Sequence, residues 1–437
     1  MIPARTTLRL NYLRKVFFLL ALLIFSLTFS ICQKNPEPKQ VSPKQSNHYR
    51  MLASTWSSDI ASIKKYVHLY DEMHPFIYNL KGGRRNTGEI HNVWSEKETR
   101  DLVLYVREKS PNTLLIPTIF RWENNSELIM EAIGAKDPDF KIRSRHIEAI
   151  LKEIDLYGWD GIDIDYEGMG CDRKEAFEDF LIELKKKLKE KDKLLSVAIH
   201  PKTAIQDTID FKCPGLKQNI KVDYFESYKG QWTHDYEFLG KVADKIKIMA
   251  YELYPRGPGF PGPGPQAPLD WIEKILDYAL AKIPKEKLYM AIPTYGYDWP
   301  LNCEGETKAV YYSYARKIIR EKNPLKKEPT SIPAIMKSYP RSTNEWPELD
   351  PYLYRHLGKV YEDPSLWYTV DGCDHVAFYM NRGAFATKYN ALKKRKIAGF
   401  SFWQLVRDND PEIHTFLEEA IKENHRESLG ESVPKHN

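Results

Sequence analysis

The segment WDGIDIDYEGMG, residues 159–170, places four acidic residues within eight positions. Asp163, Asp165 and Glu167 alternate with β-forming residues, and Asp160 precedes them out of phase. Because successive side chains of a strand point to opposite faces, the first three carboxyl groups share one face. Crowded carboxyl groups in a confined site cannot all ionise, so at least one pKa rises. The spacing therefore suits general acid catalysis by Glu167, with Asp165 as its partner.

Two other interpretations of this acidic strand are weaker. Sites for Ca²⁺ or Mg²⁺ usually take ligands from a loop with glycine turns, and a regular alternating strand is poorly suited to wrapping one ion. A merely solvated acidic face does not fit the isoleucines between the acids or the amphipathic segments on either side. We therefore expect no metal and no cofactor. We expect Asp160, at the start of the strand, to have a structural role.

Apolar β-type segments alternate with amphipathic helical segments along the chain. Near-continuous apolar strands joined by helices indicate a parallel sheet covered by helices. Eight such units over roughly 350 residues favour an α/β fold of the closed (β/α)8 TIM barrel type. An open doubly wound sheet usually carries a Gly-rich phosphate loop after its first strand, and none is visible. The predicted strands lie at residues 51–56, 74–80, 113–120, 159–167, 194–202, 246–252, 288–299 and 397–405.

The predicted catalytic barrel covers residues 50–425. Between its seventh and eighth strands the chain is much longer than one helix needs, which predicts a small inserted α+β subdomain at about 300–390. A Pro/Gly-rich loop at 255–268 follows a predicted strand, and so lies at the rim where barrel active sites are found. Residues 426–437 are predicted to form a flexible tail.

The N-terminus is typical of an exported protein. A basic segment precedes the apolar residues 16–31, and Cys32 follows them directly. We predict a signal peptide over residues 1–31, lipidation of Cys32, and a flexible Pro/Lys/Gln-rich tether over 32–49. This predicts a bacterial cell-envelope lipoprotein that faces the periplasm or the exterior, or alternatively a secreted protein. An uncleaved signal anchor, and ordinary cleavage that leaves a free cysteine, are the competing interpretations.

The remaining cysteines, Cys171, Cys213, Cys303 and Cys373, form an even set that an oxidising compartment could pair. Four cysteines allow three pairings, and four buried thiols are also possible, so the spacing does not decide between them. None of the four has the spacing of a metal site.

The charge of the chain excludes some classes of partner. Its 65 Lys and Arg residues against 60 Asp and Glu leave a formal charge of +5, without one basic stripe. Nucleic-acid binding is therefore not expected. No protein partner is predicted.

Four segments resemble the signatures of one enzyme family. DGIDIDYE matches the D-x-x-D-x-D-x-E signature of glycoside hydrolase family 18, the chitinase-like barrels. MAYE (249–252), PTYGYDW (293–299) and GFSFWQL (399–405) resemble the sixth-, seventh- and eighth-strand segments of that family. Within it, the sequence most resembles the subgroup of spore-cortex-lytic N-acetylglucosaminidases and di-N-acetylchitobiase. The resemblance spans roughly residues 50–420.

The resemblance implies a role for each residue of these segments. Glu167 is expected to protonate the glycosidic oxygen and later to activate water, Asp165 to orient the substrate's 2-acetamido group, and Asp163 to share a proton with Asp165. Tyr251 is expected to hydrogen-bond the acetamido carbonyl. Trp403 is expected to form the apolar floor under the sugar ring. The residues expected to bind substrate are Trp403, Glu252, Tyr297 and Tyr78, with Glu252 standing where many relatives have aspartate.

The expected function is that of an exported glycosidase. Its expected substrates are glycans with β-linked N-acetylglucosamine, either chitin-type oligosaccharides or peptidoglycan, cleaved with substrate-assisted retention of configuration. The alternatives are a catalytically weak chitinase-like lectin that binds carbohydrate, and a surface adhesin that uses the barrel as a scaffold. Glu167 favours the enzyme, because lectins of this kind have lost the acid.

Overall fold

The computed structural model describes residues 49–80, 88–122, 127–136, 141–203, 208–211, 220–223, 233–256, 263–301, 303–322 and 362–428. The predicted signal peptide, nearly all of the predicted tether, Cys32 and Cys213 lie outside these residues. No helix within the described residues is long and apolar enough to cross a membrane.

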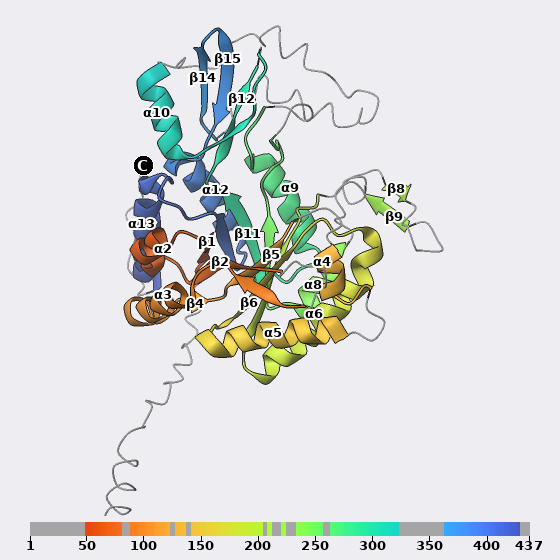
Figure 1. Cartoon of the computed structure of the whole chain (residues 1–437). Helices are drawn as coiled ribbons and strands as arrows, with labels where there is room; N and C mark the ends of the chain where they lie inside the picture. The colour runs from red at the N-terminus through yellow and green to blue at the C-terminus, as the bar shows by residue number, and fades with distance from the viewer. Residues whose placement is uncertain are drawn as a thin grey trace, which may run out of the picture. The chain divides into compact units, whose positions relative to one another are not determined.

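Eight parallel strands form a closed barrel (Figure 1). The first strand pairs with both the second and the last, which closes the sheet. The predicted TIM barrel is therefore confirmed. In the order of the barrel, the strands are β1 (Leu52–Ser57), β2 (Glu72–Leu80), β5 (Thr118–Arg121), β6 (Gly161–Tyr166), β7 (Leu194–Ile199), β10 (Lys245–Met249), β11 (Leu288–Pro293) and β16 (Gly399–Trp403).

Helices join most of these strands, as the alternating pattern predicted. The short strands β3 (Ile90–Asn92) and β4 (Leu114–Leu115) pair with β2, and β8 (Thr208–Phe211) and β9 (Ile220–Asp223) form a hairpin. The α-helices outside the inserted subdomain are α2 (Ile60–Tyr66), α3 (Glu96–Lys109), α4 (Glu127–Ala132), α5 (Lys141–Tyr157), α6 (Lys174–Glu190), α8 (Tyr236–Val242), α9 (Leu269–Leu280), α12 (Arg382–Arg395) and α13 (Pro411–Ser428). Since α13 continues to Ser428, the predicted tail is helical over its first three residues.

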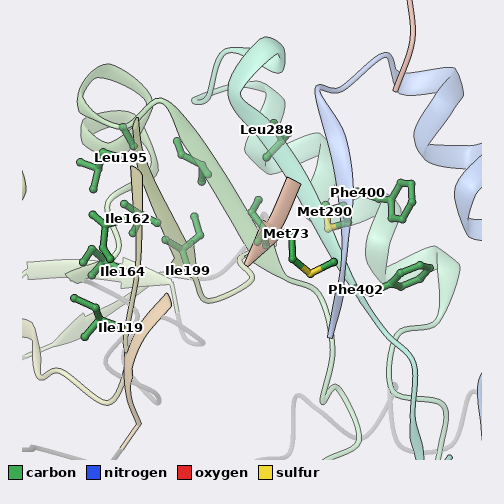
Figure 2. Close-up of a cluster of buried hydrophobic side chains, with 14 of the residues drawn as sticks. Met73, Ile119, Ile162, Ile164, Leu195, Ile199, Leu288, Met290, Phe400 and Phe402 are labelled. Atoms are coloured by element: carbon green, nitrogen blue, oxygen red, sulfur yellow. The ribbon is translucent and has the colours of Figure 1, made fainter. Parts of the chain in front are cut away.

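The outward face of the barrel strands forms the main core. Ile162, Ile164 and Tyr166 of β6 are fully buried in it, together with apolar side chains of α5 and α6. Figure 2 shows Ile162 and Ile164 in this layer near Leu195 of β7. The alternation therefore turns the intervening acidic residues of β6 toward the barrel interior.

The inserted subdomain lies between β11 and β16, as predicted. It contains the four-stranded sheet β13-β12-β15-β14 and helix α10, and stands beyond one end of the barrel in Figure 1. Its elements are β12 (Gly296–Pro300), β13 (Lys308–Val310), α10 (Tyr312–Lys322), β14 (Ser365–Val370) and β15 (Cys373–Phe378).

The prediction of one strand over residues 288–299 is wrong. The chain leaves the barrel after Pro293 and starts a strand of the inserted sheet at Gly296. A Cβ atom at position 296 would lie 1.9 Å from the carbonyl oxygen of Phe378, so only glycine permits this close approach to the end of β15. The segment that resembles the family's seventh strand therefore belongs to two sheets.

A disulfide joins Cys303 to Cys373, which ties the loop after β12 to the start of β15. Cys171, which follows β6, is also disulfide-bonded. The structure thus resolves one pairing that the sequence left open. It also places a disulfide directly after the acidic strand.

Candidate active site

The carboxyl groups of the acidic strand lie on the inner side of the barrel. Asp163 is fully buried and Asp165 is 5% exposed, both within β6. Glu167 follows the strand at its carboxyl end, with 22% of its side chain exposed. Its backbone N–H donates to the carbonyl oxygen of Arg121 at 2.8 Å, which extends the pairing of β6 with β5. The structure therefore brings the three predicted catalytic acids together, with Glu167 nearest to solvent.

Asp163 accepts two hydrogen bonds on one oxygen. Its Oδ2 atom lies 2.8 Å from the indole nitrogen of Trp56 and 2.9 Å from the hydroxyl of Thr118. The Nδ1 atom of His74 lies 4.0 Å from the same oxygen. Because an indole N–H can only donate, Oδ2 of Asp163 is the acceptor in this arrangement.

Asp165 lies one step higher on the same face of the strand and is crowded by acidic neighbours. Its pKa is raised well above the ordinary value by burial, and further by the neighbouring Glu167 and Asp163. Among the described residues its Oδ1 atom has no hydrogen-bond partner. Burial and the two neighbouring carboxyl groups therefore favour the protonated form of Asp165, below Glu167 on the strand.

Glu167 has a histidine neighbour that the sequence analysis missed. The Nε2 atom of His200, just after β7, lies 3.5 Å from Oε2 of Glu167. The backbone of His200 is fixed on both sides. Its N–H donates to His234 at 3.1 Å, and its carbonyl accepts from the hydroxyl of Tyr236 at 2.7 Å. This placement holds the imidazole beside the predicted acid.

Tyr251 lies just after β10, close to the acidic residues. Burial raises its pKa well above the ordinary value, as do the nearby carboxyl groups of Asp165, Glu167 and Glu252. The phenol therefore keeps its proton and can donate a hydrogen bond at the site. Its hydrogen bond to the acetamido carbonyl stays a prediction.

Glu252 and Tyr297 are hydrogen-bonded to each other. Oε1 of Glu252 accepts hydrogen bonds from the hydroxyls of Tyr297 at 2.7 Å and Tyr295 at 2.9 Å. Glu252 has a left-handed backbone, with φ of 61°, which turns the chain away from the strand. Tyr297 is only 6% exposed, so it holds Glu252 in place. It does not present a free surface to substrate.

Trp403 at the end of β16 begins a series of aromatic rings. Its half-buried ring lies edge-on to Trp56, at 5.9 Å between centroids, and to Phe76, at 4.7 Å. Phe76 stacks on Phe120 at 4.0 Å, and Phe120 stacks on Trp122 at 4.8 Å. Trp122 is 54% exposed. The aromatic surface therefore runs from Trp403 outward beyond the end of β5.

The sequence analysis did not predict Phe76, Phe120 or Trp122 as site residues. A signal was present, because FRW closes a predicted barrel strand at the end where barrel active sites lie. An exposed tryptophan at such a strand end is a candidate contact for a sugar ring.

Tyr78 is not part of the site, and its prediction as a substrate-binding residue is wrong. The side chain is fully buried in the layer between barrel and helices. Its hydroxyl donates to Glu153 of α5 at 2.9 Å and accepts from the indole of Trp159 at 3.1 Å. The pairing of β2 with β5 has a register shift between Phe76 and Tyr78. This irregularity breaks the simple alternation, so Phe76 faces inward and Tyr78 outward.

Asp160 lies apart from the other acids and stabilises the start of the strand. Its Oδ2 atom accepts from the guanidinium of Arg107 at 2.8 Å and from the backbone N–H of Leu115 at 2.7 Å. These contacts are structural, as the sequence predicted.

One group in the described part of the chain has the composition of a metal site. Cys303, Cys373 and His375 have possible ligand atoms within 4.8 Å of one another. The two sulfurs are joined as a disulfide and offer no thiolate, so this group does not fit a metal in the oxidised protein.

Comparison with known proteins decides the family. The profile described as glycosyl hydrolases family 18 matches residues 84–408, about three quarters of the chain. The chain belongs to glycosyl hydrolase family 18. This confirms the family and the enzyme class predicted from the sequence.

The similar proteins include bacterial enzymes of the spore. The cortical fragment-lytic enzyme of Bacillus anthracis is 26% identical over 270 residues, which cover 61% of this chain and 51% of that protein. The enzyme of the same name from Bacillus subtilis is 23% identical, and the match covers 58% of its length. The chain thus spans about half the length of these curated relatives.

Solved structures share the fold. The Bacillus cereus spore cortex-lytic enzyme SleL has a TM-score of 0.63 at 20% identity, covering 85% of this chain and 75% of that one. A chitinase from Chromobacterium violaceum has a TM-score of 0.63 at 18% identity, covering 85% and 99%.

Proposed function

We propose that the protein hydrolyses glycans that contain β-linked N-acetylglucosamine, by a retaining mechanism in which the substrate's own acetamido group is the nucleophile. The observation that carries this proposal is the pair formed by Asp165 and Glu167. Asp165 is a buried acid whose pKa is raised by burial and by its acidic neighbours, and the partly exposed carboxyl group of Glu167 follows it on the same face of the strand. Family membership and the relatives, which are named as cortical fragment-lytic enzymes, agree with this substrate class.

In the first step, the carboxyl group of Glu167 donates its proton to the glycosidic oxygen. The acetamido carbonyl oxygen attacks the anomeric carbon, the bond from that carbon to the leaving oxygen breaks, and a cyclic oxazolinium ion forms. Asp165 holds the acetamido N–H, and the hydroxyl of Tyr251 donates to the carbonyl oxygen as it attacks. Asp163 lies below the pair, where its carboxyl group can balance the charge that the amide acquires.

In the second step, the ionised Glu167 removes a proton from water. The water oxygen attacks the anomeric carbon from the side that the leaving group vacated, the ring of the intermediate opens, and the acetamido group is restored. Two inversions at one carbon leave its configuration unchanged. His200 is placed to stabilise Glu167 while it carries negative charge.

The aromatic surface suits a polymeric substrate. Trp403 provides an apolar face at the site, and Trp122 provides another farther out. Aromatic faces pack on the C–H surfaces of pyranose rings, so the two tryptophans can contact different sugars of one chain.

Digestion of three substrates in parallel tests the proposed function. We expect the protein to release fragments from N-acetylchitooligosaccharides and from purified peptidoglycan glycan strands, and none from cello-oligosaccharides of equal length, which lack the acetamido group. Mass analysis of the products identifies the bond that is cut. Binding of the N-acetylated chains without any cleavage would support the lectin alternative instead.

We also propose that the protein is exported and anchored to a membrane through Cys32. The apolar segment 16–31 followed by a cysteine supports this, and so do the disulfide-bonded Cys171, Cys303 and Cys373, because disulfides persist in oxidising compartments. Labelling of cells with an alkyne fatty acid should mark the wild-type protein and not Cys32→Ser. Equal labelling of both proteins would contradict the anchor.

A further inference from the structure

A buried ionic network lies inside the barrel below the catalytic acids. It comprises Glu72 and His74 of β2 and Lys245 and Lys247 of β10. Glu72, His74 and Lys247 are fully buried. Removing charges from water costs several kcal/mol per ion unless opposite charges and hydrogen bonds compensate, so a barrel interior rarely holds this many charges without a reason.

Each charge in the network has partners. The ammonium group of Lys247 lies 3.2 Å from Oε2 of Glu72 and 2.9 Å from the hydroxyl of Ser54. The ammonium group of Lys245 lies 2.6 Å from Oε1 of Glu72, and the hydroxyl of Tyr289 donates to that same oxygen. Burial alone would raise the pKa of Glu72, but Lys247, His74 and Lys245 hold it well below the ordinary value. Glu72 is therefore a carboxylate that faces two cations.

The network extends to Asp163. The imidazole of His74 lies between the two acids, with Nε2 3.4 Å from Glu72 and Nδ1 4.0 Å from Asp163. The ammonium group of Lys247 lies 5.7 Å from the ring of Trp56, whose indole N–H donates to Asp163. Burial lowers the pKa of Lys247, whereas Glu72 and Asp163 raise it. Lys247 therefore lies within electrostatic reach of the lowest catalytic acid.

The charges balance in one protonation state. Burial and Lys247 lower the pKa of His74, so its imidazole is neutral. Lys245 and Lys247 then carry two positive charges, and Glu72 and Asp163 carry two negative charges, provided that Asp165 keeps its proton. If Lys247 were uncharged, the ionised form of Asp163 would lack its counter-charge.

We propose that Lys247 is a positioning residue for the reaction, whose positive charge favours a proton on Asp165, beside Glu167 and the substrate, over a proton on Asp163. The proposal rests on the proposed function for its catalytic meaning. Polar, titratable and aromatic groups face Asp163 and its network from every packed strand. They are Ser54 and Trp56 of β1, Glu72 and His74 of β2, Thr118 of β5, Asp165 of β6, Ser196 of β7, Lys245 and Lys247 of β10, Tyr251 just after β10, Tyr289 of β11 and Ser401 of β16.

The test compares Lys247→Met with the double variant Lys247→Met/Glu72→Gln. The single variant removes one positive charge, so the aspartate pair retains a second proton to higher pH. We expect the acid limb of the pH profile of kcat/KM to move upward by about one pH unit or more. The double variant removes one charge of each sign, and we expect its acid limb to return toward that of the wild type. It also removes the excess of buried negative charge that the single variant leaves, so it remains informative where the single variant folds poorly.

Lys388→Met is the matched control. Lys388 is also fully buried, and its ammonium group lies 2.8 Å from both Glu362 and Asp363, away from the acidic strand. Its loss is expected to lower the Tm and to leave the acid limb in place. A merely structural role of Lys247 predicts the same behaviour for both lysines.

Titration of the aspartate carboxyl groups by carbon NMR gives a second readout that needs no turnover. We expect the ionisation of the Asp163–Asp165 pair to move upward in Lys247→Met and back in the double variant. Absence of hydrolysis by the wild type would contradict the proposed function, yet the titration would still decide the role of Lys247. The proposal would be overturned if the aspartate pair in Lys247→Met ionised at the same pH as in the wild type. It would also be overturned if the ionisation in the double variant lay no closer to that of the wild type than the ionisation in the single variant.

Discussion

Glu167→Gln is expected to lower kcat at least about 100-fold on N-acetylchitooligosaccharides, the scale of losing a positioned general acid. The amide keeps the size of the side chain but cannot donate a proton to the glycosidic oxygen. For an aryl glycoside with a dinitrophenolate leaving group, Glu167→Gln should slow release of the leaving group much less, because that group departs without protonation. The burst and steady-state rates of the two substrates give this comparison.

Asp160→Asn is the matched control within the same acidic segment. Asp160 contacts Arg107 and the backbone of Leu115, and it is about one quarter exposed. Its substitution is expected to lower the free energy of unfolding by about 1 kcal/mol, with kcat close to that of the wild type. Equal losses of kcat in Glu167→Gln and Asp160→Asn would mean that the segment acts through the fold and not through an acid.

Asp165→Asn is expected to lower kcat at least about 100-fold and to raise the Tm at neutral pH. The asparagine amide can orient the acetamido group but cannot exchange a proton with Asp163 or Glu167. The gain in stability follows from linkage. The folded state raises the pKa of Asp165 well above its unfolded value, so above about pH 4 the folded protein binds more protons than the unfolded protein. The free energy of unfolding of the wild type therefore falls as the pH rises above this value. The neutral amide of Asp165→Asn does not titrate, so the variant does not lose this stability.

Thermal unfolding from pH 4 to pH 8 measures this second effect. The difference in Tm between Asp165→Asn and wild type should be small at pH 4 and grow toward neutral pH. A variant that loses activity and is less stable than wild type at every pH would show that Asp165 is an ordinary buried hydrogen-bonding group, without a strained ionisation.

Much of the barrel was predictable because the physical signal is local. The alternation of acidic and apolar residues in β6 fixed which side chains face inward, and the amphipathic segments around it indicated the helix layer. The positions of Asp163, Asp165 and Glu167 follow from that alternation alone. So does the outward position of Ile162 and Ile164.

The errors arose where pairing between strands changes the local pattern. Nothing in HPFIYNL reveals the register shift that turns Tyr78 to the outside. The change of sheet at Gly296 depends on how closely β12 approaches the end of β15, which is a distant part of the chain. Such features are set by tertiary contacts, so the sequence of one strand cannot specify them.

The buried network was missed for a related reason. Glu72 and Lys247 lie 175 positions apart in the sequence, each near other charged residues at the start of its strand. Charged residues at a strand start predict a solvated position. Only the closure of the barrel places the two side chains together, and only then does each explain the burial of the other.

The central claim is that the nucleophile is the substrate's own amide oxygen. The most direct measurement is kcat/KM for a series of aryl N-acylglucosaminides in which the N-acetyl group carries zero, one, two or three fluorine atoms. Each fluorine withdraws electrons from the carbonyl oxygen and weakens its attack. We expect the rate to fall with each substitution, by at least about 100-fold across the series, which is about 2.7 kcal/mol in the barrier. Rates that stay level across the series would contradict the account, because they would assign the attack to a protein group or to water.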